Sequence, residues 1–490
     1  LLFSYNFKLK CPELSLHFQN FSISRYFENT QDLFDFLNII EIKQIFYNNL
    51  VSFKSLNSIL NNLVTLKKSK EIPISIAIHD FFPVCQSFTL VNQNGKYCGA
   101  ETNPKVCEVC IKENKNYEDK SISITQWRSQ WELLLENANE IICFSESSKN
   151  IINKVYANNK KVAKAIVVIR HTLPVAIPNK PVLSIKEELH IGVIGTINFH
   201  KGAEVLKSIV GYLDQQQSGK LTVIGRLSQG QINSNRFYQT GAYEPNQLPK
   251  LIENSGTNVF LFPSIWPETF SFVTDELIEM DVPVVCFDIG APSERIKKYR
   301  KGKVIPLNSS NLEIIEALKE LNNSFLQERK QYIKQKLKNT SLFNPKFYLE
   351  KYPDLAQANI DPYFHYILHG ASEGRQPSEN FDSKFYLESN FDVKSQGLNP
   401  LIHYLDFGRA EGRLPKANKI YNLYQENLKI DQNQNIAVLI HGYYTDLIEE
   451  LLNKTLSIPI RYDILISVVS AEGKNEVNKW KKKNPTVRVK

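Results

Sequence analysis

Val259-Phe-Leu-Phe262, followed after a connection by Pro283-Val-Val-Cys-Phe287, is the pair of runs that decides the fold class. Both runs are short and apolar, which is the pattern of parallel strands covered on both faces. The proline of the second run stands at the first strand position, where it is tolerated. The connection leaves the first strand at its carboxyl end, the edge at which such sheets bind ligands. We therefore predict an α/β fold with a ligand cleft beside this connection.

The connection carries two carboxylates, Glu268 and Glu276, within Pro267-Glu-Thr-Phe-Ser-Phe-Val-Thr-Asp-Glu276. We expect Glu268 to face the cleft. A helix is predicted to begin near Phe272, so that Glu276 lies about one turn into it, close to the same opening. The two carboxylates are thus expected to share one site.

This stretch resembles the Glu-x7-Glu signature of retaining nucleotide-sugar glycosyltransferases of family 4, which have the two-domain GT-B fold. The preceding chain agrees with the resemblance. A strand at His190 to Ile194, a turn at Gly195 to Gly202 that carries Lys201, and a helix at Ala203 to Leu213 resemble the glycine loop and the phosphate-binding lysine of the family. The segments that follow in matching order are the sequence Leu221-Thr-Val-Ile-Gly-Arg226, the sequence Gly241-Ala-Tyr-Glu244 and a helix from about Pro245.

The resemblance implies a role for each candidate residue. Glu276 would bind the donor ribose, and Glu268 would lie near the transferred sugar. A nucleoside diphosphate leaving group gains negative charge as the glycosidic bond breaks, and backbone N–H groups at a helix start and a nearby cation stabilise that charge. Gly195 is the candidate backbone contact, and Lys201 and Arg226 are the candidate cations. No catalytic metal ion is implied.

Each of these features has an ordinary explanation when it is taken alone. A turn such as Gly192 to Gly195 is common in βα units, Lys201 could be a surface lysine, and Glu276 could be a solvated helix residue. Their joint occurrence, in order and within one α/β half, favours the transferase interpretation. One position departs from the family, because many relatives carry an arginine where this chain has Thr196. Arg226 is the candidate replacement for that charge.

The resemblance divides the chain into four parts. Residues 1–185 are predicted to form an acceptor-side GT-B domain, and residues 186–340 the nucleotide-sugar donor domain. Residues 341–418 hold two repeats, and residues 433–490 begin a further α/β domain. The predicted fold class is thus α/β, with two Rossmann-like domains in a GT-B-like arrangement, a small helical repeat region and an incomplete α/β domain.

The acceptor-side domain carries one candidate catalytic residue, His79. It follows a predicted strand at Ile74 to Ile78 and resembles the acceptor-side histidine of the family, which could hydrogen-bond the reacting sugar. A capping or core histidine beside the turn-forming Asp80 is an equal alternative. Residues 1–70 contain no glycine, so the expected first glycine loop is missing and the domain is predicted to be truncated. The later elements of this domain are a strand at Ala138 to Phe144 and a helix at Ser145 to Ala157 with Ser145 as N-cap.

Four of the seven cysteines fall within one predicted insertion, residues 85–110. In a reducing cytosol such a cluster favours metal over disulfides, and four thiolates suit structural zinc. Their spacing is looser than that of a standard zinc ribbon, so free thiols or a redox pair remain alternatives. The four are Cys85, Cys98, Cys107 and Cys110, while Cys11, Cys143 and Cys286 are predicted to be isolated core residues.

An internal repeat follows the donor domain. Phe343 to Pro377 aligns without gaps on Phe381 to Pro415, at an offset of 38 residues. Each unit is predicted to be a short helix, a turn at Tyr352-Pro353-Asp354 or its equivalent, and a second helix through His365 or His403. The units resemble short tandem modules of some bacterial polysaccharide-assembly glycosyltransferases. Their His-Tyr pairs could stack on sugar, although a structural repeat of packed helices is the better-supported alternative.

The last part begins with a strand at Ile436 to Ile440, a helix at Tyr444 to Asn453 and a strand at Tyr462 to Val469. His441-Gly-Tyr-Tyr444 resembles the start of a rhamnan-synthesis type of domain, and His441 could equally be a turn residue. The basic tail from Lys479 is predicted to be a solvated helix and turn. The chain starts without methionine and ends within an α/β pattern, so we expect a piece of a longer protein.

Composition sets wider limits. A chain of 490 residues, 42% hydrophobic and 22% charged, has an ordinary globular balance. The net charge of +8 is spread along the chain, which suits a nucleotide sugar or an anionic membrane surface better than nucleic acid. No apolar run is long enough to span a bilayer, and the start has no signal-peptide pattern. We expect a cytoplasmic protein that could rest against the inner face of the membrane.

These observations predict a retaining glycosyltransferase that moves a sugar from a nucleoside diphosphate to a glycan or lipid-linked acceptor of the cell surface. An oxidoreductase would show a complete Gly-x-Gly-x-x-Gly loop and a later acidic residue, and neither is evident. A non-catalytic glycan-binding scaffold with a degenerate transferase domain is the second alternative, suggested by the short first half and by Thr196.

Overall fold

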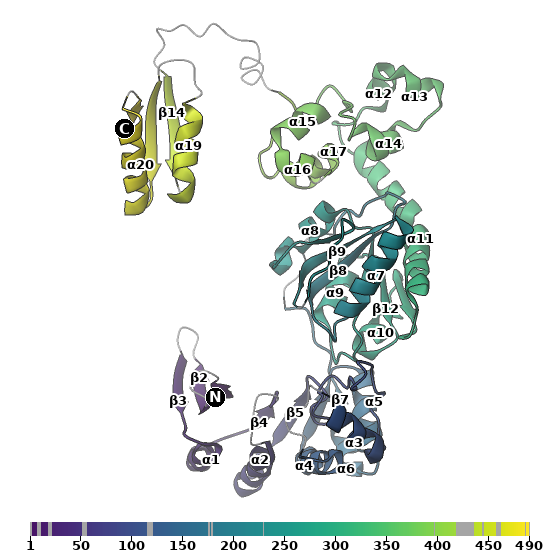
Figure 1. Ribbon diagram of the computed structural model, residues 1–490, viewed down its shortest axis with the longest axis vertical. Coiled ribbons are helices and arrows are strands. Elements are labelled where there is room, and N and C mark those ends of the chain that lie inside the picture. The colour runs from purple at the N-terminus through teal and green to yellow at the C-terminus, as the bar shows by residue number, and fades with distance from the viewer. Residues whose placement is uncertain are drawn as a thin grey trace. The chain divides into compact units, whose positions relative to one another are not determined.

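The computed structural model describes residues 2–6, 11–17, 22–50, 56–114, 121–174, 177, 180–228, 230–395, 397–417, 436–442, 445–456, 462–485 and 487–489. The chain forms two compact units, Leu1–His403 and Tyr404–Lys490. The first unit holds two parallel sheets, each within its own α/β layer structure, and a helical region after them (Figure 1). The predicted GT-B-like fold class is confirmed.

The acceptor-side half has a four-stranded parallel sheet in the order β4-β5-β6-β7. The predicted strand at Ile74 to Ile78 is confirmed as β5, and all five of its residues, including Ser75, are buried. An antiparallel sheet precedes it, which the sequence did not predict. The strands are β1 (Leu2–Asn6), β2 (Cys11–His17), β3 (Ser22–Tyr26), β4 (Ile45–Tyr47), β5 (Ile74–Ile78), β6 (Glu140–Cys143) and β7 (Ile166–Val168).

The helices of this half except α3 contribute to one apolar core with its parallel sheet, and α3 packs on the start of α4 in a separate small cluster. Ser145 is the N-cap of α5, as predicted, and its hydroxyl accepts a hydrogen bond from the Ser148 amide. The helices are α1 (Thr30–Ile39), α2 (Leu56–Lys70), α3 (Pro104–Glu113), α4 (Ile124–Glu136), α5 (Glu146–Val155) and α6 (Lys160–Ala165).

The donor-side half has a six-stranded parallel sheet in the order β10-β9-β8-β11-β12-β13. The chain moves outward from β8 to β9 and then returns to place β11 on the other side of β8. This reversal makes the carboxyl ends of β8 and β11 the switch point at which doubly wound sheets bind ligands. The strands are β8 (His190–Ile197), β9 (Lys220–Leu227), β10 (Phe237–Gln239), β11 (Val259–Phe262), β12 (Val284–Phe287) and β13 (Gly302–Ile305).

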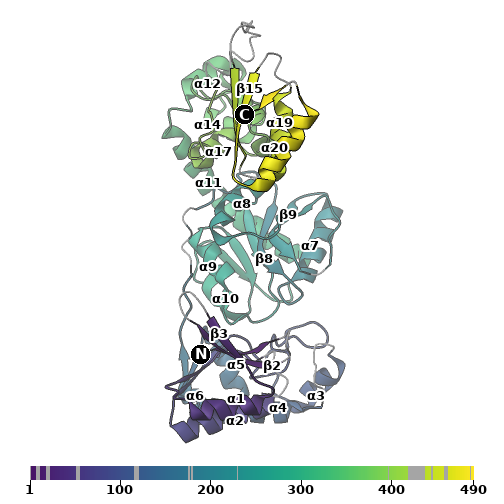
Figure 2. The same ribbon diagram turned by 90° about the vertical axis from the view of Figure 1, so that its left-hand side faces the viewer.

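Helices cover both faces of the donor sheet. Apolar residues of α7 and α11 pack on one face, and those of α8, α9 and α10 pack on the other. Figure 2 shows α7 and α9 on opposite sides of β8. The predicted turn at Gly195 to Gly202 is shorter than expected, because β8 continues through Ile197. The helices are α7 (Ala203–Gln216), the 3₁₀ turn η1 (Pro245–Gln247), α8 (Leu248–Ser255), α9 (Phe272–Glu279), α10 (Gly290–Ile296) and α11 (Asn311–Lys338).

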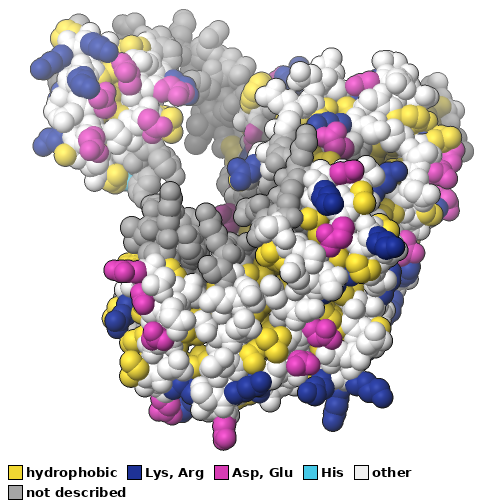
Figure 3. Space-filling view, turned by 60° about the horizontal axis from the view of Figure 1, so that its bottom comes forward, with side chains coloured by type: hydrophobic (Ala, Val, Ile, Leu, Met, Phe, Trp, Pro, Cys, Tyr) yellow, Lys and Arg dark blue, Asp and Glu magenta, His cyan; other side chains and the backbone are white. Residues whose placement is uncertain are grey.

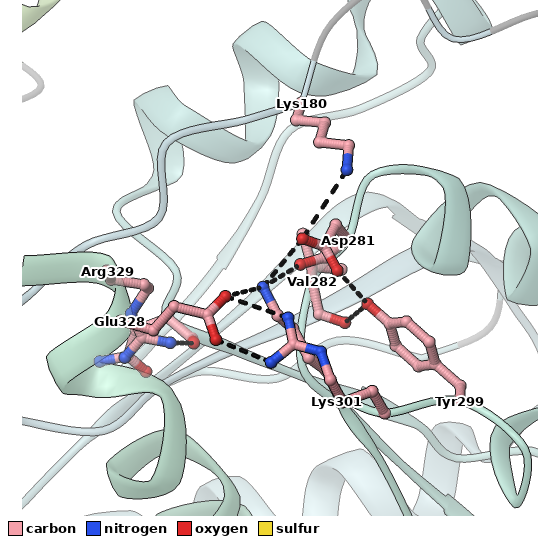
Figure 4. A network of polar contacts seen from close by, with 9 residues as sticks. Lys180, Asp281, Val282, Tyr299, Lys301, Glu328 and Arg329 are labelled. Carbon is pink, nitrogen blue, oxygen red and sulfur yellow. Dashed lines mark hydrogen bonds and ion pairs between the residues drawn. The ribbon is translucent and has the colours of Figure 1, made fainter. Parts of the chain in front are cut away.

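A network of charged side chains fastens α11 to the loops around β12 and β13 (Figure 4). Lys301 is only 6% exposed, and its Nζ lies 3.0 Å from Asp281 Oδ2 and 2.9 Å from Glu328 Oε1. Glu328 also accepts hydrogen bonds from Arg300 at 2.7 and 3.1 Å. A buried ammonium needs such partners, because an unpaired charge in the interior is strongly destabilising.

Glu328→Gln tests this network through its pH dependence. The Arg300 guanidinium lowers the pKa of Glu328 to about 2 from its ordinary value of 4.5. Because the pKa in the folded chain lies below the unfolded value, the stabilisation is present above pH 4.5 and is lost as the pH falls towards 2. We expect the variant to lower Tm by about 2 °C at pH 7, since its carboxylate is partly exposed. Thermal unfolding of the parent and the variant at pH 7 and at pH 2 measures the difference in Tm.

Glu316→Gln, on the exposed side of the same helix, is the matched control and should leave Tm unchanged. A difference for Glu328→Gln that persists at pH 2 would show that the network does not act through this carboxylate.

The repeats consist of short helices, and one sequence prediction for them is wrong. The predicted turn at Tyr352 is the start of another helix, because Pro353 occupies its first position, where a missing N–H costs nothing. The first unit contains α12 (Pro345–Lys351), α13 (Pro353–Gln357), α14 (Pro362–His365) and the π-helical turn η2 (Tyr366–Gly370). The second contains α15 (Ser383–Ser389), α16 (Phe391–Ser395), α17 (Pro400–His403) and η3 (Tyr404–Gly408).

The repeated histidines act inside the repeats. The Tyr348 hydroxyl lies 3.1 Å from His365 Nδ1, and the Tyr386 hydroxyl lies 3.0 Å from His403 Nδ1. Tyr366 is fully buried, and its hydroxyl lies 2.7 Å from Ser383 Oγ. These contacts favour the packed-helix explanation of the His-Tyr pairs over stacking on sugar.

The second unit ends in a three-stranded parallel sheet with helices beside it. The basic tail does not end in the predicted turn, since Arg488 pairs with Asp463 and Val489 with Ile464 in a parallel register. Tyr443 and Tyr444 of the predicted motif lie outside the described residues. The elements are β14 (Ile436–Gly442), the 3₁₀ turn η4 (Thr445–Leu447), α19 (Ile448–Thr455), β15 (Tyr462–Val468), α20 (Ala471–Lys483) and β16 (Arg488–Val489).

Charge is distributed over the surface. Figure 3 shows Lys, Arg, Asp and Glu side chains interspersed on the face that it presents. Within the described part of the chain, no helix combines the length and the apolar composition needed to cross a membrane.

Candidate active site

Two glycines shape the end of the central strand. Gly195 and Gly225 stand opposite each other on β8 and β9, with φ of +110° and +135°. A Cβ on Gly225 would lie 2.1 Å from the carbonyl oxygen of Gly195, so only glycine allows this approach. On its other side Gly195 faces the first turn of α9, where a Cβ on it would lie 3.8 Å from Val273 Cγ2.

The loop after β8 carries Lys201 and packs against the end of β11. The Lys201 amide donates a hydrogen bond to Asn198 Oδ1 at 3.1 Å, which closes the turn. Gly202 begins α7 with φ of +94°, and a Cβ there would lie 2.2 Å from the Pro263 carbonyl oxygen. This close contact holds Lys201 beside the loop that follows β11.

The signature loop runs from this point to α9. The Ile265 amide donates to the His200 carbonyl at 3.0 Å, which joins the two loops. Ser271 caps α9 by accepting from the Thr274 amide, so the helix begins at Phe272 as predicted. The amino end of α9, with its partial positive charge, therefore opens at the switch point.

Glu268 and Lys201 interact at this site. Glu268 is only 4% exposed, and burial raises the pKa of its carboxyl group while the nearby Lys201 ammonium opposes the rise. Its Oε1 is buried and has no hydrogen-bond partner among the described residues. A buried carboxylate oxygen without a partner is costly, and a hydroxyl group of a bound ligand would satisfy it.

Glu276 occupies the same opening one turn into α9. Glu276 lies three residues after Val273, so the side chains of these two residues project from one face of α9. Gly195 lies beside Val273 on that face. Burial, followed by repulsion from Asp275, raises the pKa of Glu276. Its Oε2 is a second buried oxygen that lacks a partner within the described residues. Gly195 and Lys201 thus lie at and after the carboxyl end of β8, and Glu268 and Glu276 lie on the chain that follows β11. All four belong to this switch point, which we call the donor crevice.

Arg226 lies at the edge of this crevice. It is directly opposite Thr196 in the register of β8 and β9, and its side chain is exposed. No hydrogen bond or ion pair holds its guanidinium to any residue that the structure describes. Arg226 and Thr196 are therefore neighbours across the two strands, and the replacement of a charge at position 196 by Arg226 stays a prediction.

His79 contributes from the acceptor-side half. It follows β5 directly, and the Thr269 hydroxyl donates to its carbonyl oxygen at 2.8 Å. Thr269 is the neighbour of Glu268, so this bond brings the histidine to the signature loop. Burial, followed by the nearby His171, lowers the pKa of His79. The Asp80 carboxylate accepts from the Phe82 amide at 2.8 Å, which confirms its expected turn role.

An aromatic cluster surrounds this contact, and the sequence analysis missed it. The His171 ring stacks on Phe144 with centroids 4.0 Å apart and lies 5.0 Å from Phe270 of the signature loop. It also stacks near His79, with centroids 5.8 Å apart. Recognition of β7 would have revealed the residue, because His171 follows that strand at the same sheet edge as His79.

A second contact between the halves was also missed. The Glu294 carboxylate accepts hydrogen bonds from the Glu146 amide at 3.2 Å and from the Ser147 amide. These amides open α5, where a negative charge is favourable. Glu294 belongs to α10, so this contact joins the donor-side half to the acceptor-side half.

The predicted zinc site is not reproduced. Among the described residues, no three Cys, His, Asp or Glu side chains are arranged to hold a metal ion. Burial raises the pKa of the Cys107 thiol, which lies 3.6 Å from the Glu101 carbonyl oxygen, and Cys98 and Cys110 raise it further. Cys85 packs against the small apolar cluster around Cys107. Cys143 and Cys286 are buried core residues, as predicted, and the Cys11 side chain lies outside the described residues.

Comparison with protein families decides the class of the donor-side half. Residues 178–339 match the family described as "Glycosyl transferases group 1". We call residues 178–339 the group 1 domain, after the family that this part of the chain matches. This domain holds the six-stranded sheet and the crevice with Lys201, Glu268 and Glu276. Residues 413–490 match the family described as "Rhamnan synthesis protein F", in agreement with the resemblance seen at His441.

Several solved glycosyltransferases resemble the chain that contains this domain. The lipopolysaccharide outer core galactosyltransferase WaaB shares 11% identity at a TM-score of 0.38, over 60% of this chain and 70% of that chain. Anabaena HepE in complex with UDP-glucose shares 13% identity at a TM-score of 0.36, over 61% of this chain and 77% of that chain. A mutant of S. aureus TarM in complex with UDP shares 14% identity at a TM-score of 0.39, over 74% of this chain and 64% of that chain. No curated protein matches the chain.

Glu268→Gln separates stability from activity in the group 1 domain. Because the pKa of Glu268 in the folded chain lies above its ordinary value of 4.5, folding disfavours the charged form. This penalty is absent below pH 4.5 and grows as the pH rises above it. We expect the variant to raise Tm by about 2–4 °C at pH 7, to match the parent at pH 4 and to lose sugar transfer. Calorimetry at both pH values measures the shift.

Glu279→Gln, an exposed carboxylate at the end of α9, serves as the control and should change neither property. A lower Tm for Glu268→Gln at pH 7 would contradict the argument.

Proposed function

We propose that this glycosyltransferase is a retaining enzyme that uses a nucleoside diphosphate sugar and elongates a cell-surface glycan. The observation that carries the proposal is the convergence of Lys201, Glu268 and Glu276 on the switch point between β8 and β11. The rhamnan-synthesis segment in the same chain supports a polysaccharide or lipid-linked acceptor at the inner face of the membrane.

The donor diphosphate fits the amino end of α9 and the backbone at Gly195. The N–H groups there and the positive charges of Lys201 and Arg226 stabilise the negative charge that develops on the leaving group. These cations take the part that a metal ion plays in other transferases, so the mechanism has no step that needs a catalytic metal. Glu276 accepts hydrogen bonds from the ribose hydroxyls through the oxygen that lacks a partner.

The transferred sugar fits between Glu268 and His79. The raised pKa of Glu268 increases the share of its neutral form, which can donate a hydrogen bond to a sugar hydroxyl near the anionic diphosphate. The lowered pKa of His79 keeps its ring neutral at pH 7, so that it donates a hydrogen bond without adding charge. The acceptor hydroxyl then enters on the face from which the diphosphate leaves, and the anomeric configuration is retained.

Donor binding tests the ribose contact. A panel of nucleotide sugars is titrated by calorimetry into the parent and into Glu276→Ala. Loss of a charge-assisted hydrogen bond to ribose is expected to weaken the donor about 10- to 100-fold. Glu279→Ala removes an exposed carboxylate from the same helix and should bind as the parent does. Equal affinity of Glu276→Ala and the parent would remove the assignment.

Product stereochemistry tests the retaining mechanism. Proton NMR during the first turnovers of the active donor should show the anomeric configuration of the donor in the product. An inverted product would refute retention while leaving the donor site intact.

A second function is favoured by Thr196, which stands where relatives carry a cation. A non-catalytic scaffold would bind glycan acceptor and show no affinity for any nucleotide sugar of the panel. The same titration therefore distinguishes the two functions.

A further inference from the structure

A cavity of about 470 Å³ lies at the edge of the donor sheet opposite to the candidate active site. His190 and Lys220, which open β8 and β9, line it from the group 1 domain, whereas the active site lies at the carboxyl ends of these strands. The repeats supply the other wall, through η2 and the loop before α17. Figures 1 and 2 show the helical repeats at the end of the domain where α8 lies. The volume is within the range of small-molecule sites.

Two side-chain amides leave polar atoms without partners at this cavity. Asn399 Oδ1 accepts a hydrogen bond from the Ile402 amide at 3.1 Å, so its Nδ2 is the group left over. This Nδ2 and Asn254 Oδ1 are both buried, and neither has a hydrogen-bond partner among the residues that the structure describes. Both residues line the cavity. An unmet donor and an unmet acceptor in one cavity indicate a ligand that can both accept and donate.

The first repeat shows that capping of this helix uses a side-chain oxygen and does not need the Asn399 Nδ2. The equivalent residue 38 positions earlier is Asp361. Asp361 caps α14 by accepting from the Tyr363 amide at 3.0 Å, and its carboxylate pairs with Lys334 of α11. An aspartate therefore performs the capping role in this motif. The additional donor of Asn399 is a property of the second repeat alone.

The remaining walls determine the ligand class. Apolar side chains of α11, η2 and α17 contribute Ile333, Ile367 and Ile402. Two lysines and two glutamates also line the cavity, so its charges balance. An uncharged molecule with alternating hydroxyl and C–H surfaces matches this mixture. The charged residues are Lys186, Lys220, Glu188 and Glu253.

We propose that the cavity between the group 1 domain and the repeats is a second carbohydrate site, which binds a short neutral oligosaccharide through Asn254 and Asn399. A sugar hydroxyl accepts from Asn399 Nδ2 and another donates to Asn254 Oδ1, while C–H faces contact the isoleucines. The site is separate from the donor crevice and does not depend on the transfer reaction.

Asn399→Asp tests the site with little risk to the fold, because Asp361 shows that aspartate caps this helix in the first repeat. The full chain is titrated with maltose, cellobiose, a rhamnose disaccharide and a glucuronate-containing disaccharide, with binding followed by saturation-transfer NMR and calorimetry. At least one neutral disaccharide should bind. The variant should weaken it about 5- to 10-fold, since one buried hydrogen bond is lost.

Asn344→Asp is the matched control, because Asn344 caps α12 in the same way at an exposed position away from the cavity. It should bind as the parent does, and so should Glu276→Ala, so that failure of the donor proposal is distinguishable from failure of this one. Absence of binding by every neutral disaccharide, as when the amides hold only water, would overturn the proposal. So would a preference for the glucuronate probe or unchanged affinity of Asn399→Asp.

Discussion

The site depends on the pairing of β8 with β11, in which Gly192 lies opposite Phe260. A Cβ on Gly192 would lie 2.4 Å from the Phe260 ring, so the buried ring keeps its position between the strands because this residue is glycine. This pairing places β11 beside β8 and creates the reversal of strand order. The loops after both strands then open at one crevice, and every candidate residue of the donor site reaches it from there.

The crevice is built at a cost to stability. Burial raises the pKa of both Glu268 and Glu276, and repulsion from Asp275 raises that of Glu276 further. A fold selected for stability alone would exclude such groups or pair them fully. Elsewhere in the same domain charge is paired closely, since Lys301 meets both Asp281 and Glu328. In the crevice, by contrast, one buried oxygen each of Glu268 and Glu276 has no partner among the described residues.

The long helix α11 connects the donor sheet with the repeats. Its first half packs on the donor sheet, and its last turns meet the repeats through Ile333 and through the pair of Lys334 with Asp361. The repeats are therefore fastened to the transferase domain by buried and charged contacts, and the cavity at this junction is a defined part of one compact unit.

The sequence by itself determined the features that depend on neighbouring residues. Short, mostly apolar runs predicted β5, β11 and β12, and Ser145 marked the start of α5, because these signals act within a few positions. The order of the motifs also placed Gly195, Lys201, Glu268 and Glu276 around one sheet edge, while their roles stay predictions. The register of the repeats was also readable, although the helix at Pro353 was mistaken for a turn.

Only the tertiary structure decided which distant residues meet. Sheet order and packing brought His171 and Phe270 together, set Glu294 against α5 and paired the basic tail with β15. Among the described residues, the four clustered cysteines are not arranged to hold a metal ion. Asn254 and Asn399, which are far apart in the chain, line one cavity. Local periodicity carries no information about such contacts, because they depend on the register and packing of strands and helices that are far apart in the chain.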